Sequence, residues 1–279
     1  MTILLKDIGQ KMENEDNLHH LLWTGGWDST FRLIQIIVLL GEEVQPYYII
    51  DPNRKSVRHE MRAMQWLKKE IFERYPTARS TVKPTQYIEL NSISKNNRIM
   101  QSYKKIYDSF PIGIQYEWLA RFACQYEIDN LELAVEKGLG HMNELLKKIL
   151  EFQESKEQST YRVKLDLKGK DAYTLFEHFT FPIIDTYKSD MIRISKGSGF
   201  FDILEKTWFC HNPLSNGKPC GVCTPCTQVV KEDMSFRLPL HSRVRYHFRL
   251  VLSKEQLKQY CPKLYYILRG LKGMFKKPD

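Results

Sequence analysis

An apolar run, two glycines and an amphipathic run follow one another directly in residues 20–38 of this chain. The first run, His20–Trp23, is typical of a short strand, and Asp28–Val38 is typical of a helix. A tight turn between a strand and a helix leaves several backbone N–H groups aimed the same way, which makes a cradle for phosphate. This order of elements favours an α/β fold that binds an anion at the loop.

Three kinds of group in this loop suit a nucleotide phosphate. Gly25 and Gly26 let the backbone approach the anion closely. Hydroxyl donors and one carboxylate follow in the same segment: Thr24, Ser29, Thr30 and Asp28. The carboxylate either caps the helix or helps to hold Mg²⁺. A plain turn and helix cap with incidental glycines is the alternative interpretation.

A second motif contains four cysteines with the spacing C-x9-C-x2-C-x2-C, in a segment rich in Gly and Pro. Its cysteines are Cys210, Cys220, Cys223 and Cys226. Four thiolates in such a loop close a tetrahedral structural Zn²⁺ site. An iron–sulfur cluster and a disulfide knot are the competing interpretations.

Composition limits the class of protein and its surroundings. With 279 residues, 42% of them hydrophobic, the chain is long enough for one sizeable α/β core. No apolar run approaches a membrane span, so we expect no membrane partner. The absence of an apolar signal peptide predicts a cytoplasmic location, where disulfides are rare. The net charge of +9 favours acidic ligands, with nucleic acid a less favoured partner.

Runs typical of strands and helices alternate beyond the glycine loop. Strands are expected at 44–50, 85–90 and 131–135, and helices at 57–75, 114–126 and 141–152. Alternation of this kind predicts a doubly wound, mostly parallel sheet with helices on both faces. Ligands of such sheets bind at the carboxyl ends of strands, where the loop after Trp23 and the turn after Ile50 lie.

Two regions are expected along the chain. Residues 1–235 form the α/β domain with the cysteine loop, 205–232, embedded in it. Residues 236–279 form an appended basic helical segment, helical in pattern over 254–271, which offers a contact for a homodimer or a partner protein.

Together the two motifs resemble the 7-cyano-7-deazaguanine synthases, a branch of the PP-loop ATP pyrophosphatases. Thr24–Ser29 is similar to the Ser-Gly-Gly-x-Asp-Ser loop of that superfamily, and Gly217–Cys226 fits Gly-x-x-Cys-Gly-x-Cys-x-x-Cys. Phe181–Ile192 and Thr207–Cys210 resemble further family elements more loosely. The resemblance covers roughly residues 18–232 and implies an adenine nucleotide alpha hydrolase-like fold. It also implies that the protein binds ATP, Mg²⁺ and Zn²⁺.

The resemblance also implies a reaction and its residues. An ATP-dependent carbon–nitrogen ligase of this family adenylates the carboxylate of 7-carboxy-7-deazaguanine, releases pyrophosphate, and uses ammonia to form an amide and then a nitrile. Asp28, Ser29 and Lys188 match its catalytic positions, and the adenine would lie near Ile50 and Asp51.

Three segments depart from the family pattern on the side of the substrate and the amine: 51–56, 111–116 and 140–143. These departures favour retained activation chemistry with a changed acceptor, such as the protein amine used by phage-defence relatives. A tRNA-sulfurating enzyme of the same superfamily and a non-enzymatic zinc module that binds nucleic acid are the alternatives from other classes.

Overall fold

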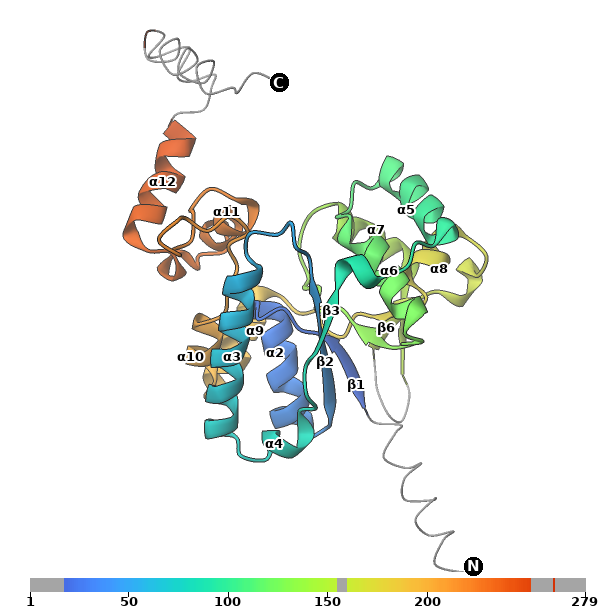
Figure 1. Cartoon of the computed structure of the whole chain (residues 1–279), viewed down its shortest axis with the longest axis horizontal. Coiled ribbons are helices and arrows are strands. Elements are labelled where there is room, and N and C mark those ends of the chain that lie inside the picture. Colours follow the sequence, from blue (N-terminus) through green and yellow to red (C-terminus); the bar gives the residue numbers. More distant parts are fainter. Residues whose placement is uncertain (1–17, 155–159, 252–262, 264–279) are drawn as a thin grey trace, which may run out of the picture. The chain divides into compact units, whose positions relative to one another are not determined.

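The computed structural model describes residues 18–154, 160–251 and 263 of the chain (Figure 1). Two compact units make up the chain, Met1–Trp208 and Phe209–Asp279. The cysteine loop and the last described helix therefore lie in the same unit, and the domain boundary at 235/236 remains a prediction. The expected helix at 254–271 lies outside the described residues, apart from Lys263.

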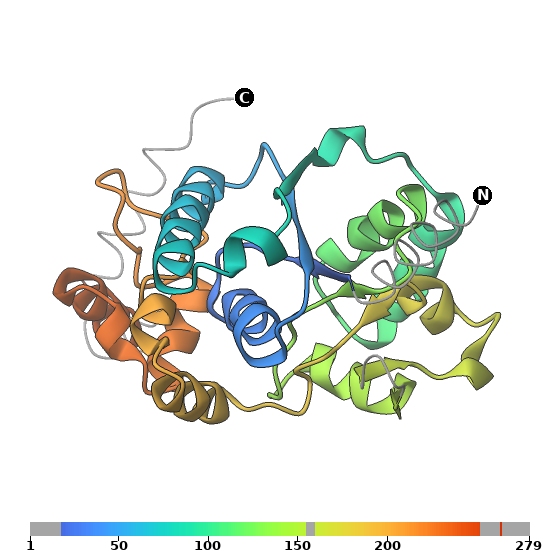
Figure 2. The same cartoon turned by 90° about the horizontal axis from the view of Figure 1, so that it is seen from below.

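A five-stranded parallel sheet forms the centre of the first unit (Figures 1 and 2). Its strands, in spatial order, are β3 (Gln86–Glu89), β2 (Val44–Ile50), β1 (His19–Leu22), β4 (Leu131–Glu132) and β7 (Phe179–Thr180). His19 of β1 is paired with Val44 of β2, and His20 with Leu131 of β4. The chain thus runs from β1 outward to β3 and then returns to the other side of β1. Ligands in parallel sheets bind beside such a reversal, at the carboxyl ends.

Helices flank the sheet on both faces (Figure 1). One group comprises α2 (Trp27–Ile34), α3 (Val57–Arg74), α9 (Lys188–Gly197) and α10 (Phe201–Glu205). The other comprises α5 (Asn97–Ser109), α6 (Gln115–Gln125), α7 (His141–Ile149) and α8 (Asp171–Phe176). The predicted α/β fold with a parallel, helix-flanked sheet is therefore confirmed at this level.

The individual elements agree with the sequence pattern to different degrees. The strand expected at 44–50 has those bounds, whereas the strand expected at 131–135 contains two residues. The helix expected at 28–38 is α2 followed by a π-helical turn, η1 (Gln35–Leu40). The helix expected at 141–152 ends at Ile149, because Leu150–Gln153 (β5) pairs with Thr160–Val163 (β6) in an antiparallel hairpin.

Smaller elements complete the description: α4 (Ala78–Thr81), η2 (Leu90–Ser92) and η3 (Leu165–Leu167) in the first unit, and α11 (Thr224–Lys231), η4 (Ser235–Arg237) and α12 (Leu240–Val251) in the second. Among the described residues, no helix has both the length and the apolar content that crossing a bilayer requires.

A buried cluster of charged side chains lies under the helix that follows the glycine loop. Glu132 of β4 accepts hydrogen bonds from Arg32 Nε at 2.7 Å and Arg32 Nη2 at 2.9 Å. His19 Nδ1 lies 2.6 Å from Glu132, and its Nε2 lies 2.5 Å from Glu42. Because β1, β4 and α2 each contribute one member, the cluster ties the helix to the two central strands.

Burial and ion pairing shift the pKa values of Glu132 and His19 in opposite directions. Burial alone would raise the pKa of Glu132, but the Arg32 charge and the hydrogen bonds from Arg32 and His19 outweigh it and hold the pKa at about 2. Burial likewise acts to lower the pKa of His19, but Glu132 and Glu42 raise it above 6.5. The pairing therefore favours the ionised form of both Glu132 and His19.

Replacing Glu132 by Gln should lower the free energy of unfolding by about 3–5 kcal/mol, because it leaves Arg32 buried without its carboxylate. The Glu132 contribution is present above pH 4.5 and is lost as the pH falls toward 2, whereas the His19 contribution is present below pH 6.5 and is lost at higher pH. Urea unfolding should therefore show the largest difference from the natural chain between pH 4.5 and 6.5. Glu89→Gln, an exposed position on β3, should change stability by less than about 0.5 kcal/mol, and an equal effect of both variants would contradict the assignment.

Candidate functional site

The glycine loop runs from β1 into α2, and its first glycine has a left-handed backbone conformation. Gly25 has φ +68°, and a Cβ at this position would lie 2.8 Å from Met64 Cγ and 3.3 Å from the Glu60 carbonyl oxygen. Gly26 is the N-cap residue of α2, and no side chain caps the helix there. The N-terminal dipole of α2 is therefore directed into the loop without a carboxylate or hydroxyl already at the cap.

The hydroxyl groups predicted for the loop have different surroundings. Ser29 Oγ accepts from the Thr24 N–H at 3.3 Å and lies 3.3 Å from Thr24 Oγ1, so the two residues meet across the loop. Thr30 is fully buried, and its Oγ1 accepts a hydrogen bond from Trp23 Nε1 at 3.1 Å. Thr24 and Ser29 are thus at the loop, whereas Thr30 lies in the core beneath it.

An aromatic pair lies beside the loop. The Trp208 N–H donates to the Gly25 carbonyl at 2.9 Å, and the Trp208 ring stacks on His59 of α3 with centroids 4.6 Å apart. Burial and the neighbouring Arg62 and Arg58 lower the pKa of His59, so its ring is neutral near pH 7. Trp27, inside the loop segment, is instead buried with its ring edge against Phe201.

A buried ion-pair group lies where three strands of the sheet end. Lys188, the first residue of α9, pairs with Asp28 in the first turn of α2 and with Glu136, 2.9 Å away. These residues follow β7, β1 and β4 respectively, so the parallel pairing brings together side chains that are 160 positions apart. Only 12% of the Lys188 side chain and 14% of the Glu136 side chain are exposed.

Charge neutralisation fixes the protonation state of this lysine. Burial acts to lower the pKa of Lys188, but the carboxylates of Asp28 and Glu136 outweigh it and raise the pKa above 10.5. The backbone supports the geometry, since the Lys137 N–H donates to Thr186 O at 3.0 Å and the Lys137 ammonium lies 4.9 Å above the Tyr187 ring. The group therefore presents a protonated, buried amine at the carboxyl edge of the sheet.

No sequence pattern indicates Glu136 as part of the candidate site. It belongs to the irregular segment after a two-residue strand, without any motif around it. The signal that identifies it is spatial: a second carboxylate within ion-pair distance of the lysine.

The residues expected near the adenine lie at the same edge of the sheet. Ile50 is the last residue of β2, and Asp51 opens a turn in which its Oδ1 accepts from the Asn53 N–H at 2.9 Å. Both are half-buried. β2 is paired in parallel with β1, so their carboxyl ends lie side by side.

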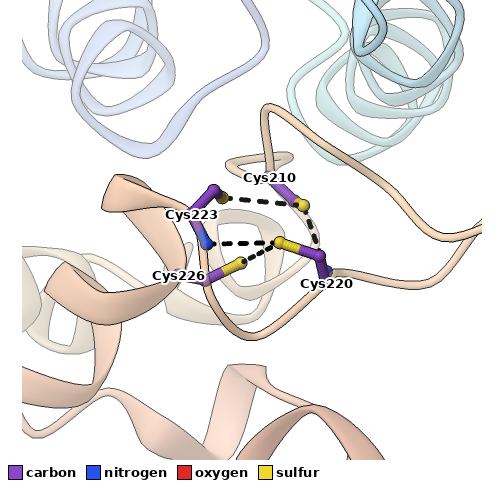
Figure 3. Close-up of side chains that lie close together, drawn as sticks. All are labelled: Cys210, Cys220, Cys223 and Cys226. Atoms are coloured by element: carbon purple, nitrogen blue, oxygen red, sulfur yellow. Dashed lines mark hydrogen bonds between the residues drawn. The ribbon is translucent and has the colours of Figure 1, made fainter. Parts of the chain in front are cut away.

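The four cysteines of the second unit converge on one point (Figure 3). Their sulfur atoms all lie within 4.8 Å of one another, and the pairs Cys220–Cys226 and Cys210–Cys223 are each 3.9 Å apart. Sulfurs bound at 2.3 Å around a tetrahedral zinc ion are about 3.8 Å apart, so the donor set fits such an ion. The described cysteines form no disulfide.

Backbone groups and the last described helix hold this cysteine centre. The Cys220 N–H donates to Cys210 Sγ at 3.2 Å, and the Cys223 and Val222 N–H groups donate to Cys220 Sγ at 3.3 and 3.4 Å.

Helix α12 also contacts the cysteine loop. Ser242 Oγ donates to the Pro219 carbonyl at 2.6 Å, and Arg245 Nε donates to the Cys220 carbonyl at 2.9 Å. The N–H···S bonds to Cys210 and Cys220 stabilise thiolates, which are the form of cysteine that binds metal.

Comparison of the sequence with protein-family models and with curated proteins finds no match.

Cys223→Ser should lose the bound metal, because three thiolates and a hydroxyl bind Zn²⁺ far more weakly than four thiolates. Metal content measured by plasma mass spectrometry should fall from about one ion per chain to less than about 0.1. Cys124→Ser, which removes an exposed thiol outside the cluster, should keep full occupancy. Full zinc content in Cys223→Ser, or iron in the natural chain, would contradict a four-thiolate zinc centre.

Proposed function

We propose that this chain is an ATP-dependent ligase that adenylates the carboxylate of 7-carboxy-7-deazaguanine and passes the acyl group to an amine. The observation that carries the proposal is the meeting of the glycine loop with the buried Lys188 ammonium at one edge of the sheet. The loop suits phosphate, and the lysine suits the charge that develops when an α-phosphate is attacked.

The sheet supports this assignment. Its strand order reverses beside β1, as in doubly wound folds, and the glycine loop follows β1 at that reversal. We assign the unit on this basis to the adenine nucleotide alpha hydrolase-like fold. The adenine then lies against the backbone at Ile50 and Asp51, on the strand adjacent to the loop.

The loop would hold the β- and γ-phosphates of ATP. The backbone approaches closely at Gly25 and Gly26, while Thr24 and Ser29 add hydroxyl donors next to the N-terminus of α2. The carboxylate of Asp28 would offer a ligand to Mg²⁺ bound with ATP, and the ion would neutralise charge on the departing pyrophosphate.

In the first step, a carboxylate oxygen attacks the α-phosphorus and the bond from that phosphorus to the bridging oxygen breaks. Pyrophosphate leaves with the electron pair, and an acyl-adenylate remains. Lys188 donates hydrogen bonds to the α-phosphate oxygens, where negative charge gathers in the transition state. Glu136 would remain as the ion-pair partner of Lys188 if Asp28 contacts the nucleotide. It would then keep the lysine protonated and in position.

In the second step, an amine nitrogen attacks the acyl carbon and AMP leaves with one of the original carboxylate oxygens. The nitrogen loses a proton, which gives an amide. With ammonia as the amine, a second ATP adenylates the amide oxygen. Loss of two protons from the nitrogen then expels AMP and forms the nitrile.

The acceptor is the part of the reaction for which a second candidate has support. Residues 111–114, within one of the segments that depart from the synthase pattern, line an open surface pocket of about 430 Å³ together with Tyr103 and Tyr107. Exposed Tyr107 and Ile114 give this segment an apolar surface, which suits contact with a peptide chain. A protein amine as acceptor is therefore the alternative, in a cytoplasmic reaction.

The other two classes have weaker support. A sulfur-transferring enzyme needs a reactive thiol at the site, and the four clustered cysteines are arranged for metal, while Cys124 is a single exposed thiol on α6. A purely binding zinc module leaves the buried Lys188–Asp28–Glu136 group without a role.

The proposed activity is tested by incubating the chain with ATP, Mg²⁺ and 7-carboxy-7-deazaguanine, with ammonia in half of the samples, and measuring AMP, pyrophosphate and acyl products by mass spectrometry. We expect AMP and pyrophosphate that depend on the carboxylate. Lys188→Met should reduce their rate by about 10²–10³-fold, because one charged donor to the transition state is lost. Lys196→Met on the exposed side of α9 should not change it. Turnover that is independent of the carboxylate, or unaffected by Lys188→Met, would contradict the proposal.

A second prediction concerns the role of Glu136. Replacing it by Gln removes one of the carboxylates that raise the pKa of Lys188, so the ammonium is lost at lower pH than in the natural chain. The alkaline limb of the kcat/KM profile should move to lower pH by about one unit or more, while the rate near neutrality falls less than in Lys188→Met. Glu136→Asp should restore most of the alkaline activity. An unchanged pH profile in Glu136→Gln would show that Glu136 does not set the charge of Lys188.

A further inference from the structure

The charge of this chain is divided unevenly between its two units. Residues 209–279 contain 13 lysine and arginine side chains and 4 aspartate and glutamate side chains, which accounts for the whole net charge of +9. Residues 1–208 are neutral overall. The unit that holds the cysteine centre is thus strongly basic, and the ATP chemistry proposed for the first unit gives no reason for this.

Helix α12 has its polar side against the protein and its apolar side in solvent. Ser242 is fully buried, and the cysteine loop passes so close that a Cβ on Gly221 would lie 2.1 Å from the Ser242 carbonyl oxygen. Leu240, Val244 and Phe248 recur every four residues and are 76%, 43% and 59% exposed. At 3.6 residues per turn these three side chains form one stripe, on the opposite side of the helix from Ser242.

Basic groups flank this stripe on both sides. His247 and Arg243 lie along one edge, and His241 and Arg245 along the other. The arginines are fixed, because Arg243 Nε donates to the Leu238 carbonyl at 2.8 Å and Arg245 Nε to the Cys220 carbonyl at 2.9 Å. The sequence of α12 contains no lysine and no acidic residue.

A stripe of three large apolar side chains is not a scattered surface feature, since water-exposed apolar side chains in a row mark a contact site. A second copy of α12 does not suit it, because both parallel and antiparallel pairing would bring cationic edges together. Phosphate backbones gain nothing from leucine and valine, and a fluid lipid surface needs no fixed guanidinium groups. Arginine and aromatic residues without lysine are typical of protein interfaces.

We propose that the outward face of α12, formed by Leu240, Val244 and Phe248 with Arg243 and Arg245 beside them, docks an amphipathic helix of a partner protein. The partner helix has an apolar stripe that packs against Leu240, Val244 and Phe248. Acidic residues lie on both sides of that stripe. Its carboxylates pair with the fixed guanidinium groups, and its apolar side chains cover Val244 and Phe248. The surface does not depend on the proposed ligase activity.

The test uses the full-length, metal-loaded chain and a fluorescein-labelled synthetic peptide of about 20 residues, long enough to form a helix. The peptide has leucines along one stripe and glutamates on both edges. Matched control peptides keep the leucines with lysine in place of glutamate, or keep the glutamates with serine in place of leucine. Fluorescence anisotropy should show saturable binding of the acidic amphipathic peptide and no binding of either control peptide. Added salt should weaken this binding.

Val244→Ser combined with Phe248→Ser should weaken the binding by at least about tenfold, because two apolar contacts are lost. Arg243→Gln should weaken it and reduce its dependence on salt. Leu139→Ser, which removes an exposed leucine in the first unit, should leave binding unchanged. Zinc content and circular dichroism establish that each variant is folded.

Four results would overturn the proposal. They are the absence of binding to the acidic peptide, equal binding in the Val244/Phe248 variant, self-association of the natural chain that the same substitutions abolish, and a preference for phosphatidylserine vesicles or oligouridine that requires the stripe. Equal binding in the variant would place the peptide on another part of the chain. Self-association would assign the face to a second copy, and the vesicle or oligouridine preference would assign it to a lipid or nucleic-acid surface.

Discussion

The parallel pairing of β1 with both β2 and β4 is the constraint on which the candidate site depends. It sets the carboxyl ends of three neighbouring strands at one edge of the sheet, and the strand β7 beside β4 brings the Lys188 segment to the same edge. The ion pairs among Arg32, Glu132 and His19 secure α2 against β1 and β4 beneath the glycine loop. A shift of one strand would separate Lys188 from Asp28 and remove the site.

Local patterns in the sequence indicate those parts of the candidate site that consist of contiguous residues. The glycine loop and the cysteine spacing each encode their geometry within a few residues, so Gly25, Ser29 and the four thiols could be named in advance. Lys188 was named through the family resemblance, and its position beside Asp28 supports the role assigned to it. Glu136 could not be predicted, because its place depends on which strands are neighbours and not on the residues around it.

Tertiary packing accounts for the remaining differences. Thr30 carries a hydroxyl group like Ser29, but its side chain faces inward and binds the Trp23 indole. The helix that begins at His141 stops at Ile149 because the next four residues pair with β6, and no Gly or Pro in residues 149–153 marks this end in the sequence. The outward apolar face of α12 has a helical period that by itself indicates a buried stripe, and only the contacts of Ser242 identify the face turned toward the protein.

In the proposed reaction, the chain transfers an adenylyl group to a carboxylate oxygen. The most direct test of this transfer uses 7-carboxy-7-deazaguanine labelled with ¹⁸O in both carboxylate oxygens, incubated with ATP, Mg²⁺ and an amine, followed by mass spectrometry of the nucleotide product. We expect AMP that carries one ¹⁸O atom and pyrophosphate that carries none, because the carboxylate oxygen leaves with the α-phosphorus. Unlabelled AMP, or label in pyrophosphate or inorganic phosphate, would contradict it.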